Sequence, residues 1–273
     1  MNLRMKKKIL YTIIPAVVVL GYVVYQQLHS NAVNTPQEDH SVVVTTDIEL
    51  PQLSSNTPQQ IIEHTAYTVS YNPIWNIPNW VAYSLTKEET TGTYPREDSF
   101  YPDPKVKGQP VVHKDYTRSG YDRGHMAPAA DMKWSEQAMR ESFYMTNICP
   151  QNQSLNRGDW NDLEELARDW ARKYGEIYIV CGPLVSEDYN TIGRNNQIAI
   201  PDAFYKVFLR QHDTSWTAIG FVMPNQAGNR PLMSYMLSID EIEELSGIDF
   251  FYQLPDAIEN NIEKAFSTSN WTL

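Results

Sequence analysis

The chain has 273 residues, of which 42% are hydrophobic and 12% aromatic, so it can bury the core of one or two domains. This composition excludes a collagen-like, low-complexity or wholly disordered chain. With 22 basic against 33 acidic residues the net charge is −11, which argues against a protein that coats nucleic acid through a basic surface.

The start of the chain combines a basic cluster with an apolar run. Residues 1–8 contain four basic and no acidic side chains, and residues 9–25 are uncharged. An apolar helix of that length, about 25 Å, is just long enough to cross a bilayer, with its basic flank in the cytoplasm. We therefore expect residues 1–30 to be a signal anchor or a cleaved signal peptide, so that the rest of the chain is extracytoplasmic; a buried core helix is the third alternative.

The rest of the chain divides by composition. Residues 31–62 are rich in Asn, Gln, Ser, Thr and Pro, which predicts a polar linker. Residues 63–273 are expected to form one globular domain. Because residues 1–30 carry four of the basic side chains and no acid, the net charge of the chain without them is −15.

Short runs of aromatic and β-branched residues predict the strands, at 65–71, 80–86, 176–181, 205–210 and 216–222. The Gly182-Pro183 pair is expected to end the third run. Helices are predicted at 135–144, 159–174, 240–245 and 256–266. This order has no regular βαβ rhythm, so we expect an α+β fold, with a mainly antiparallel sheet core flanked by helices.

The helix at 159–174 has the strongest pattern. Its apolar residues recur at steps of three and four and predict one buried stripe. Asp159 is the expected N-cap, Gly175 the expected left-handed C-terminal residue, and Ser135 the expected N-cap of the preceding helix.

The sequence YDRGHMAPAADM at 121–132 carries the first candidate chemistry. We expect Asp122 to His125 to form a loop after a strand that ends near Tyr116. His125 is suited to accept a proton near neutral pH, and the guanidinium of Arg123 matches phosphate oxygens. Gly124 would allow a tight turn between them.

A second candidate cluster surrounds the start of the strong helix. Asn147, Asn156 and Glu164 lie within TNICPQNQSLNRGDWNDLEE at 146–165. Asn156, Trp160 and Glu164 are spaced at i, i+4 and i+8, which predicts one helical ridge. An oxygen ligand before the helix and a carboxylate two turns into it can hold a hard cation such as Mg²⁺.

Together these motifs resemble a known family. DRGH at 122–125, T-N-x-x-P-Q at 146–151 and L-N-x-x-x-W-x-x-L-E at 155–164 closely resemble the DNA/RNA non-specific endonucleases, which have a ββα-metal core. The resemblance covers about residues 65–270. Its weaker matches are 79–83, Arg96 with Phe100 and Asp103-Pro104, and 181–184.

The resemblance implies an Mg²⁺-dependent hydrolase that cleaves the phosphodiester bonds of DNA and RNA and leaves 5′-phosphate ends. His125 would be the general base, Asn156 the direct metal ligand, and Glu164 a ligand through metal-bound waters. Mn²⁺ is the alternative ion. Arg123 and Arg96 would brace the phosphate, and Asn147 would support the geometry of the site.

Other interpretations stay open at this point. His125 could be an ordinary loop histidine, Asn156 a helix cap, and Glu164 or Arg96 a surface charge. The alternative functions are a narrower phosphodiesterase, acting on one nucleic acid or on short oligonucleotides, and a catalytically silent envelope domain that binds nucleic acid. Cys149 and Cys181 could be a disulfide or two thiols, and the oligomeric state is undetermined.

Overall fold

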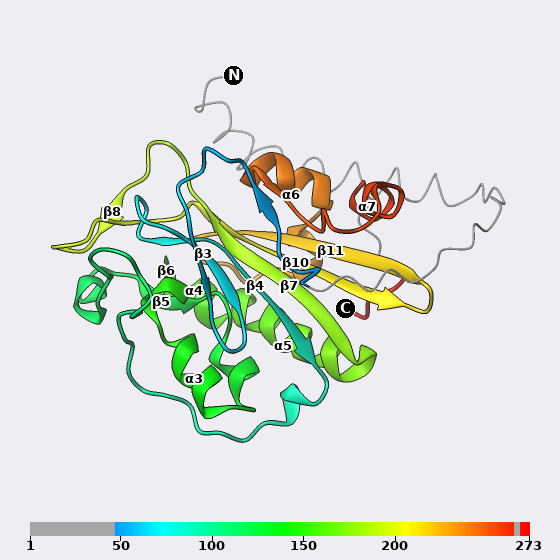
Figure 1. The fold of residues 1–273 in the computed structure, drawn as a ribbon, viewed down its shortest axis with the longest axis horizontal. Coiled ribbons are helices and arrows are strands. Elements are labelled where there is room, and N and C mark those ends of the chain that lie inside the picture. The colour runs from blue at the N-terminus through cyan, green and yellow to red at the C-terminus, as the bar shows by residue number, and fades with distance from the viewer. Residues whose placement is uncertain (1–46, 265–267) are drawn as a thin grey trace. The chain divides into compact units, whose positions relative to one another are not determined.

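The computed structural model describes residues 47–264 and 268–273. Its central feature is an antiparallel sheet of seven strands (Figure 1). In spatial order the strands are β12 (Met236–Leu237), β11 (Ser215–Pro224), β10 (Ala203–His212), β7 (Glu176–Leu184), β4 (Ile77–Thr86), β3 (Thr68–Asn72) and β2 (Gln60–Glu63). This sheet with flanking helices confirms the expected α+β fold.

Smaller strand pairs and the helices complete the described part. The pairs are β5 (Asp122–His125) with β6 (Ile148–Gln151), β1 (Gln52–Leu53) with β13 (Ile248–Asp249), and β8 (Thr191–Ile192) with β9 (Ile198–Ala199). The α-helices are α3 (Glu136–Ser142), α4 (Gln153–Arg157), α5 (Asp159–Tyr174), α6 (Ile239–Ser246) and α7 (Asp256–Glu263).

The sheet buries both of its faces, since most residues of the inner strands β7 and β10 are buried, whichever face they point to. On one face, Trp160, Leu163 and Trp170 of α5 join a core that also contains Ile148 and Cys149 of β6. On the other face, α6 and α7 cover a second core (Figure 1). The candidate site residues belong to the α5 side.

The stripe predicted for α5 is confirmed, and Gly175 ends the helix with a φ of 97°. The predicted cap is wrong, because Gly158 occupies the N-cap position. The Asp159 carboxylate instead accepts hydrogen bonds from the backbone of Asn229 and from the hydroxyl of Tyr235, both distant in sequence. The predicted cap at Ser135 is confirmed, since its hydroxyl accepts from the Ala138 amide.

Two predicted boundaries are also wrong. β7 continues through Gly182-Pro183 to Leu184, because both residues pair with β10. Gly182 suits this position, since a Cβ there would lie 2.5 Å from the Asn79 carbonyl and from the Tyr205 hydroxyl. Tyr116 belongs to a 3₁₀ turn at His113–Tyr116 rather than to a strand.

The predicted linker extends too far along the chain. β1 pairs with β13, and β2, which begins at Gln60, pairs with β3. The described part of the expected linker, residues 47–62, therefore belongs to the folded part. The expected signal segment at 1–30 lies outside the described residues. None of the helices in the described ranges combines the length and the apolar character that crossing a bilayer takes.

Candidate active site

The DRGH sequence forms strand β5 rather than a loop. Antiparallel pairing with β6 sets Arg123 opposite Pro150 and His125 opposite Ile148. Gly124 is required by the partner strand and not by a turn, since a Cβ there would lie 2.0 Å from the Gln151 side-chain oxygen. An extended strand therefore turns Arg123 and His125 to the same side of the pair.

His125 lies in an apolar niche. Its ring centroid is 5.4 Å from that of Phe100 and 4.8 Å from that of Phe143, and the residue is 8% exposed. Nε2 is buried with no hydrogen-bond partner. Burial, with a smaller contribution from the Arg96 charge, lowers the pKa of His125 to about 3. The ring is therefore neutral at physiological pH and can accept a proton.

Both predicted arginines lie against this niche. The Arg96 guanidinium carbon is 5.0 Å from the centroid of the Phe143 ring, so one aromatic ring contacts both Arg96 and His125. The Arg123 guanidinium carbon is 5.6 Å from the centroid of Phe100, and Nη2 donates to the His113 carbonyl at 2.9 Å. Nε of Arg123 is buried without a partner.

Asn147 fixes the chain that follows His125. Its fully buried side chain accepts from the Ala127 amide and donates to the carbonyls of Ala127 and Ser142, all at 2.8–2.9 Å. The Met126 amide donates to the Asn147 carbonyl. With these bonds made, Asn147 acts through the backbone beside His125.

Asn156 lies in the short helix α4, one residue before the break to α5. Gly158, at φ −112° and ψ −114°, interrupts the helix, so the predicted i, i+4, i+8 ridge is not continuous. The Asn156 amide nitrogen donates to the Asp122 carboxylate at 3.1 Å. This bond ties α4 to the start of β5, and Arg157 reinforces it with an ion pair to Asp122.

Glu164 faces a buried lysine. Lys206 of β10 is 1% exposed, and its Nζ lies 4.0 Å from the Glu164 carboxylate and 4.5 Å from the centroid of the Trp160 ring. Nζ also donates to the Met126 carbonyl at 3.4 Å, directly after His125. Burial raises the pKa of Glu164 to about 7, although Lys206 opposes the shift.

These contacts bring the predicted residues into one connected region. Arg96, Arg123 and His125 share the aromatic niche, Asn147 holds the next backbone segment, and Lys206 links that segment to Glu164. Asn156 joins through the start of β5.

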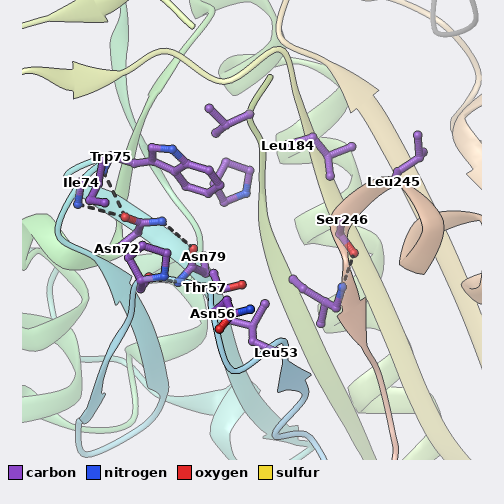
Figure 2. Close-up of a pocket in the computed structure, with 14 residues that line it drawn as sticks. Leu53, Asn56, Thr57, Asn72, Ile74, Trp75, Asn79, Leu184, Leu245 and Ser246 are labelled. Atoms are coloured by element: carbon purple, nitrogen blue, oxygen red, sulfur yellow. Dashed lines mark hydrogen bonds between the residues drawn. The ribbon is translucent and has the colours of Figure 1, made fainter. Parts of the chain in front are cut away.

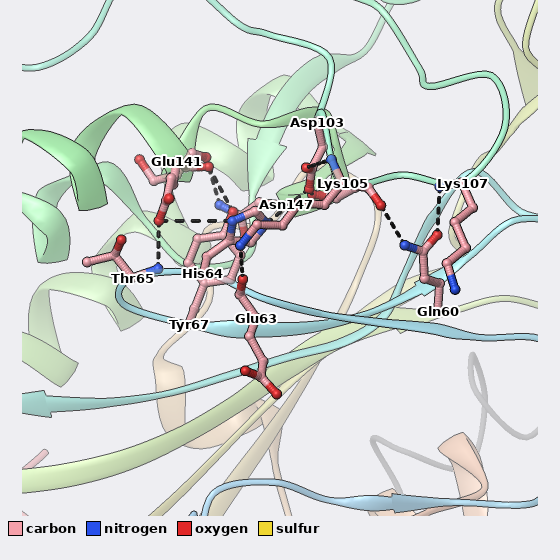
Figure 3. A network of polar contacts seen from close by, with 12 residues as sticks. Gln60, Glu63, His64, Thr65, Tyr67, Asp103, Lys105, Lys107, Glu141 and Asn147 are labelled. Atoms are coloured by element: carbon pink, nitrogen blue, oxygen red, sulfur yellow. Dashed lines mark hydrogen bonds and ion pairs between the residues drawn. The ribbon is translucent and has the colours of Figure 1, made fainter.

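A buried polar network joins His64 to Asp103 and Glu141 (Figure 3). His64 Nε2 lies 3.0 Å from the Asp103 carboxylate, which also accepts from the Thr146 hydroxyl at 2.6 Å. His64 Nδ1 is 4.0 Å from Glu141. The backbone of Tyr101 pairs with the segment that carries Phe143, so this network holds Phe100 and Phe143 in place.

Three further residues of this region were not predicted from the motifs. Lys206 had a signal, since it is the one charge within the otherwise apolar run AFYKVFL. Gln151 lay inside a recognised motif but received no role; it is fully buried, and both of its amide atoms lack partners. His64 had none, because its partners are distant in sequence.

The cysteines resolve as two buried thiols, with Cys181 Sγ donating to the Met126 carbonyl at 3.2 Å. A pocket of about 360 Å³ lies elsewhere, between the β3–β4 turn and the end of α6 (Figure 2). Its lining includes Trp75, Asn79 and Leu184 and none of the predicted site residues.

The donor set fits a hard divalent cation. Because the Asn156 amide nitrogen is engaged with Asp122, its carbonyl oxygen is left for another ligand. Glu164 adds a buried carboxylate, whose pKa is raised to about 7 mainly by that burial. Oxygen atoms of this kind are those that Mg²⁺ and Mn²⁺ prefer.

An antiparallel strand pair followed by a helix, with a neutral buried histidine on the strand and side chains that carry oxygen atoms near the helix, defines a ββα site in an α+β protein. The chain belongs to the DNA/RNA non-specific endonuclease family, whose family model matches residues 44–257. That match includes part of the stretch expected to be a linker.

Relatives and a solved structure agree with this assignment. A mitochondrial nuclease EXOG of Danio rerio is 38% identical over 69% of this chain and 60% of its own length. Mitochondrial endonuclease G of Homo sapiens is 32% identical over 70% of this chain and 69% of its own length. A chain in the crystal structure of the EndoG/EndoGI complex superposes with a TM-score of 0.68 and 31% identity, covering 73% of this chain and 89% of that one. The chain thus spans about 60% of the length of the EXOG relative.

Proposed function

We propose that this protein is a divalent-metal-dependent endonuclease that hydrolyses phosphodiester bonds of both DNA and RNA. The observation that carries the proposal is the buried, unpartnered Nε2 of a neutral His125, beside two arginines. A neutral imidazole in this state can take a proton from an attacking water. Family membership supports a nucleic-acid substrate.

Each residue of the site has a role that follows from its position. His125 Nε2 accepts the proton from the water that attacks phosphorus. Arg123 and Arg96 hold the phosphate oxygens and balance the charge that develops on them. Asn147 keeps the backbone beside His125 in place, and Lys206 orients Glu164.

Asn156 and Glu164 are the proposed metal residues, Asn156 directly and Glu164 through water. When bound, Mg²⁺ or Mn²⁺ would stabilise the charge on the phosphate and on the leaving 3′-oxygen. With the metal on the 3′-oxygen side, we propose that the products carry 5′-phosphate ends.

The decisive experiment is a digestion assay with the full chain on plasmid DNA and on RNA, with Mg²⁺ and then with EDTA. His125→Ala should lose activity by about 10²–10⁴-fold, and Asn156→Ala should raise the Mg²⁺ concentration that is required for activity. His212→Ala, a histidine with a half-exposed side chain, is the matched control. If wild type and His125→Ala degrade both substrates equally, the assignment is wrong.

The same assay distinguishes the alternatives. Comparable initial rates on duplex DNA, single strands and RNA support the non-specific enzyme, whereas turnover of one substrate alone indicates the narrower phosphodiesterase. Binding without turnover in any divalent metal indicates the silent binding domain. Product ends are assigned by whether a ligase or a polymerase accepts them directly.

We also propose that the catalytic domain is exported, through membrane anchoring or after cleavage of a leader. The support is the basic cluster and uncharged run within residues 1–25. Expression in a bacterium with a C-terminal tag, followed by fractionation and by accessibility of the tag to added protease, tests this. A tag found only in the cytosol would contradict it.

A further inference from the structure

Three carboxylates converge on the face of the sheet opposite the nuclease site. Asp240 and Glu243 lie one turn apart on α6, and Glu263 is the last residue of α7. One carboxylate oxygen from each residue lies within 4.8 Å of the other two. Like charges at such distances repel unless a proton or a cation lies among them.

Glu263 is the unusual member of this trio. The residue is 6% exposed, and its Oε1 is buried with no hydrogen-bond partner. A buried carboxylate is costly unless it is paired or coordinates a metal. One of its oxygens lies among the acidic trio, and none of the ion pairs in the described part of the chain involves this carboxylate.

Further acidic side chains lie near Glu263. Asp249 and Glu259 contribute further repulsion, and together these acids, with burial as the larger cause, raise the pKa of Glu263 to about 9. Burial likewise raises the pKa of Glu243 to about 7. One Glu243 oxygen accepts from the Phe250 amide at 2.8 Å, which fixes the carboxylate and leaves its other oxygen for a ligand.

We propose that Asp240, Glu243 and Glu263 bind a hard divalent cation, Ca²⁺ in particular, at a structural site that joins α6 to α7. Ca²⁺ takes carboxylate oxygens at about 2.3–2.6 Å, so oxygens on opposite sides of the ion lie up to about 5 Å apart. The observed spread fits this limit. Mg²⁺, with ligands at about 2.0–2.1 Å, requires a tighter set.

The site would stabilise the layer that covers the second core. Ile242, next to Glu243, and Ile262, next to Glu263, are both buried in that core. A cation that joins the two helices therefore stabilises their packing on the sheet. This proposal does not depend on the nuclease function, because none of its residues belongs to the candidate active site.

Calcium binding is best measured on the full chain carrying Asn156→Ala, which weakens the proposed active-site metal position. After treatment with EGTA, CaCl₂ is titrated by calorimetry at pH 7.5, and Tm is recorded in EGTA and in Ca²⁺. Glu263→Gln and Glu243→Gln are the test variants, and Glu244→Gln, an exposed acid on the same helix, is the matched control.

We expect one binding event and a rise in Tm with Ca²⁺. Either test variant should weaken binding by about tenfold or more, while the control retains it. In EGTA, Glu263→Gln should melt above its parent, because it removes an uncompensated buried acid. No Ca²⁺ binding by the parent, or an affinity in both test variants equal to that of the parent, would overturn the site; a Tm that rises only as the pH is lowered would then indicate shared protons instead.

Discussion

The ammonium group of Lys206 lies 4.0 Å from the Glu164 carboxylate, between the sheet and α5. The same ammonium group donates to the Met126 carbonyl, in the backbone directly after His125. The lysine thus couples the proposed base to the proposed metal residue. It also opposes the burial that raises the pKa of Glu164 to about 7.

Lys206→Met should lower activity at neutral pH. Removing the positive charge raises the pKa of Glu164 further, so less of it is ionised at pH 7. A shift of one unit reduces the ionised fraction by up to about tenfold. The pH profile of kcat should move to higher pH, with activity recovering above pH 8.

The double variant provides the control for this coupling. If Lys206 acts through Glu164, Lys206→Met should have little further effect in a Glu164→Gln background. Additive losses in the double variant would show that Lys206 acts elsewhere, for example only through its bond to the Met126 carbonyl.

Arg96→Gln should shift the acid limb of kcat/KM upward. The positive charge of Arg96 lowers the pKa of His125, in addition to the larger effect of burial. Without that charge His125 protonates at a higher pH, so the active neutral form is lost sooner as pH falls. The shift should stay below about one unit, since burial dominates.

The control is Arg194→Gln, an exposed arginine outside the site. A lower kcat with an unchanged acid midpoint would show that Arg96 acts on the phosphate alone.

The elements that could be predicted from the sequence are those set by local pattern. The stripe of α5 and the two long strands β10 and β11 follow from periodicity within each segment. The errors at Asp159 and Gly182 arose because distant partners override local preference. The Asp159 carboxylate accepts a hydrogen bond from the Asn229 amide instead of capping the helix, and pairing with β10 keeps Gly182 within the strand.

The site shows the same limit. His125, Arg123 and Asn156 could be identified from the motifs, but their surroundings are formed by segments that are distant in the sequence. Nothing local indicates that Gly124 makes room for Gln151, or that Lys206 approaches Glu164 from another strand. Such contacts follow from sheet order and packing, which a single sequence specifies only weakly.

Asn147→Ala should impair both stability and activity. The substitution leaves the backbone amide and carbonyl of Ala127 buried without partners, which should cost about 3 kcal/mol in the free energy of unfolding. Urea unfolding measures this loss. At a temperature where the variant is folded, kcat should still fall, because the backbone beside His125 is no longer held. A folded variant with normal kcat would contradict the positioning role.

Asp103→Asn should destabilise the protein in a pH-dependent way. Burial alone would raise the pKa of Asp103, but hydrogen bonds from His64 and Thr146 outweigh it and hold that pKa below its ordinary value. The ionised Asp103 therefore contributes stability above its unfolded pKa of about 3.9, and this contribution is lost as pH falls through the lower folded value. Losing these hydrogen bonds to a charged carboxylate should cost about 1.5–3 kcal/mol at pH 7.

The measurement is urea unfolding of wild type and Asp103→Asn at pH 7, 5 and 3.5. The difference in free energy of unfolding should be largest at pH 7 and should narrow toward pH 3.5, where the wild-type carboxylate begins to lose its advantage. Asp98→Asn, an exposed acid in the preceding segment, should show little difference at any pH. A gap for Asp103→Asn that is constant with pH would mean that shape, not charge, holds Phe100 beside His125.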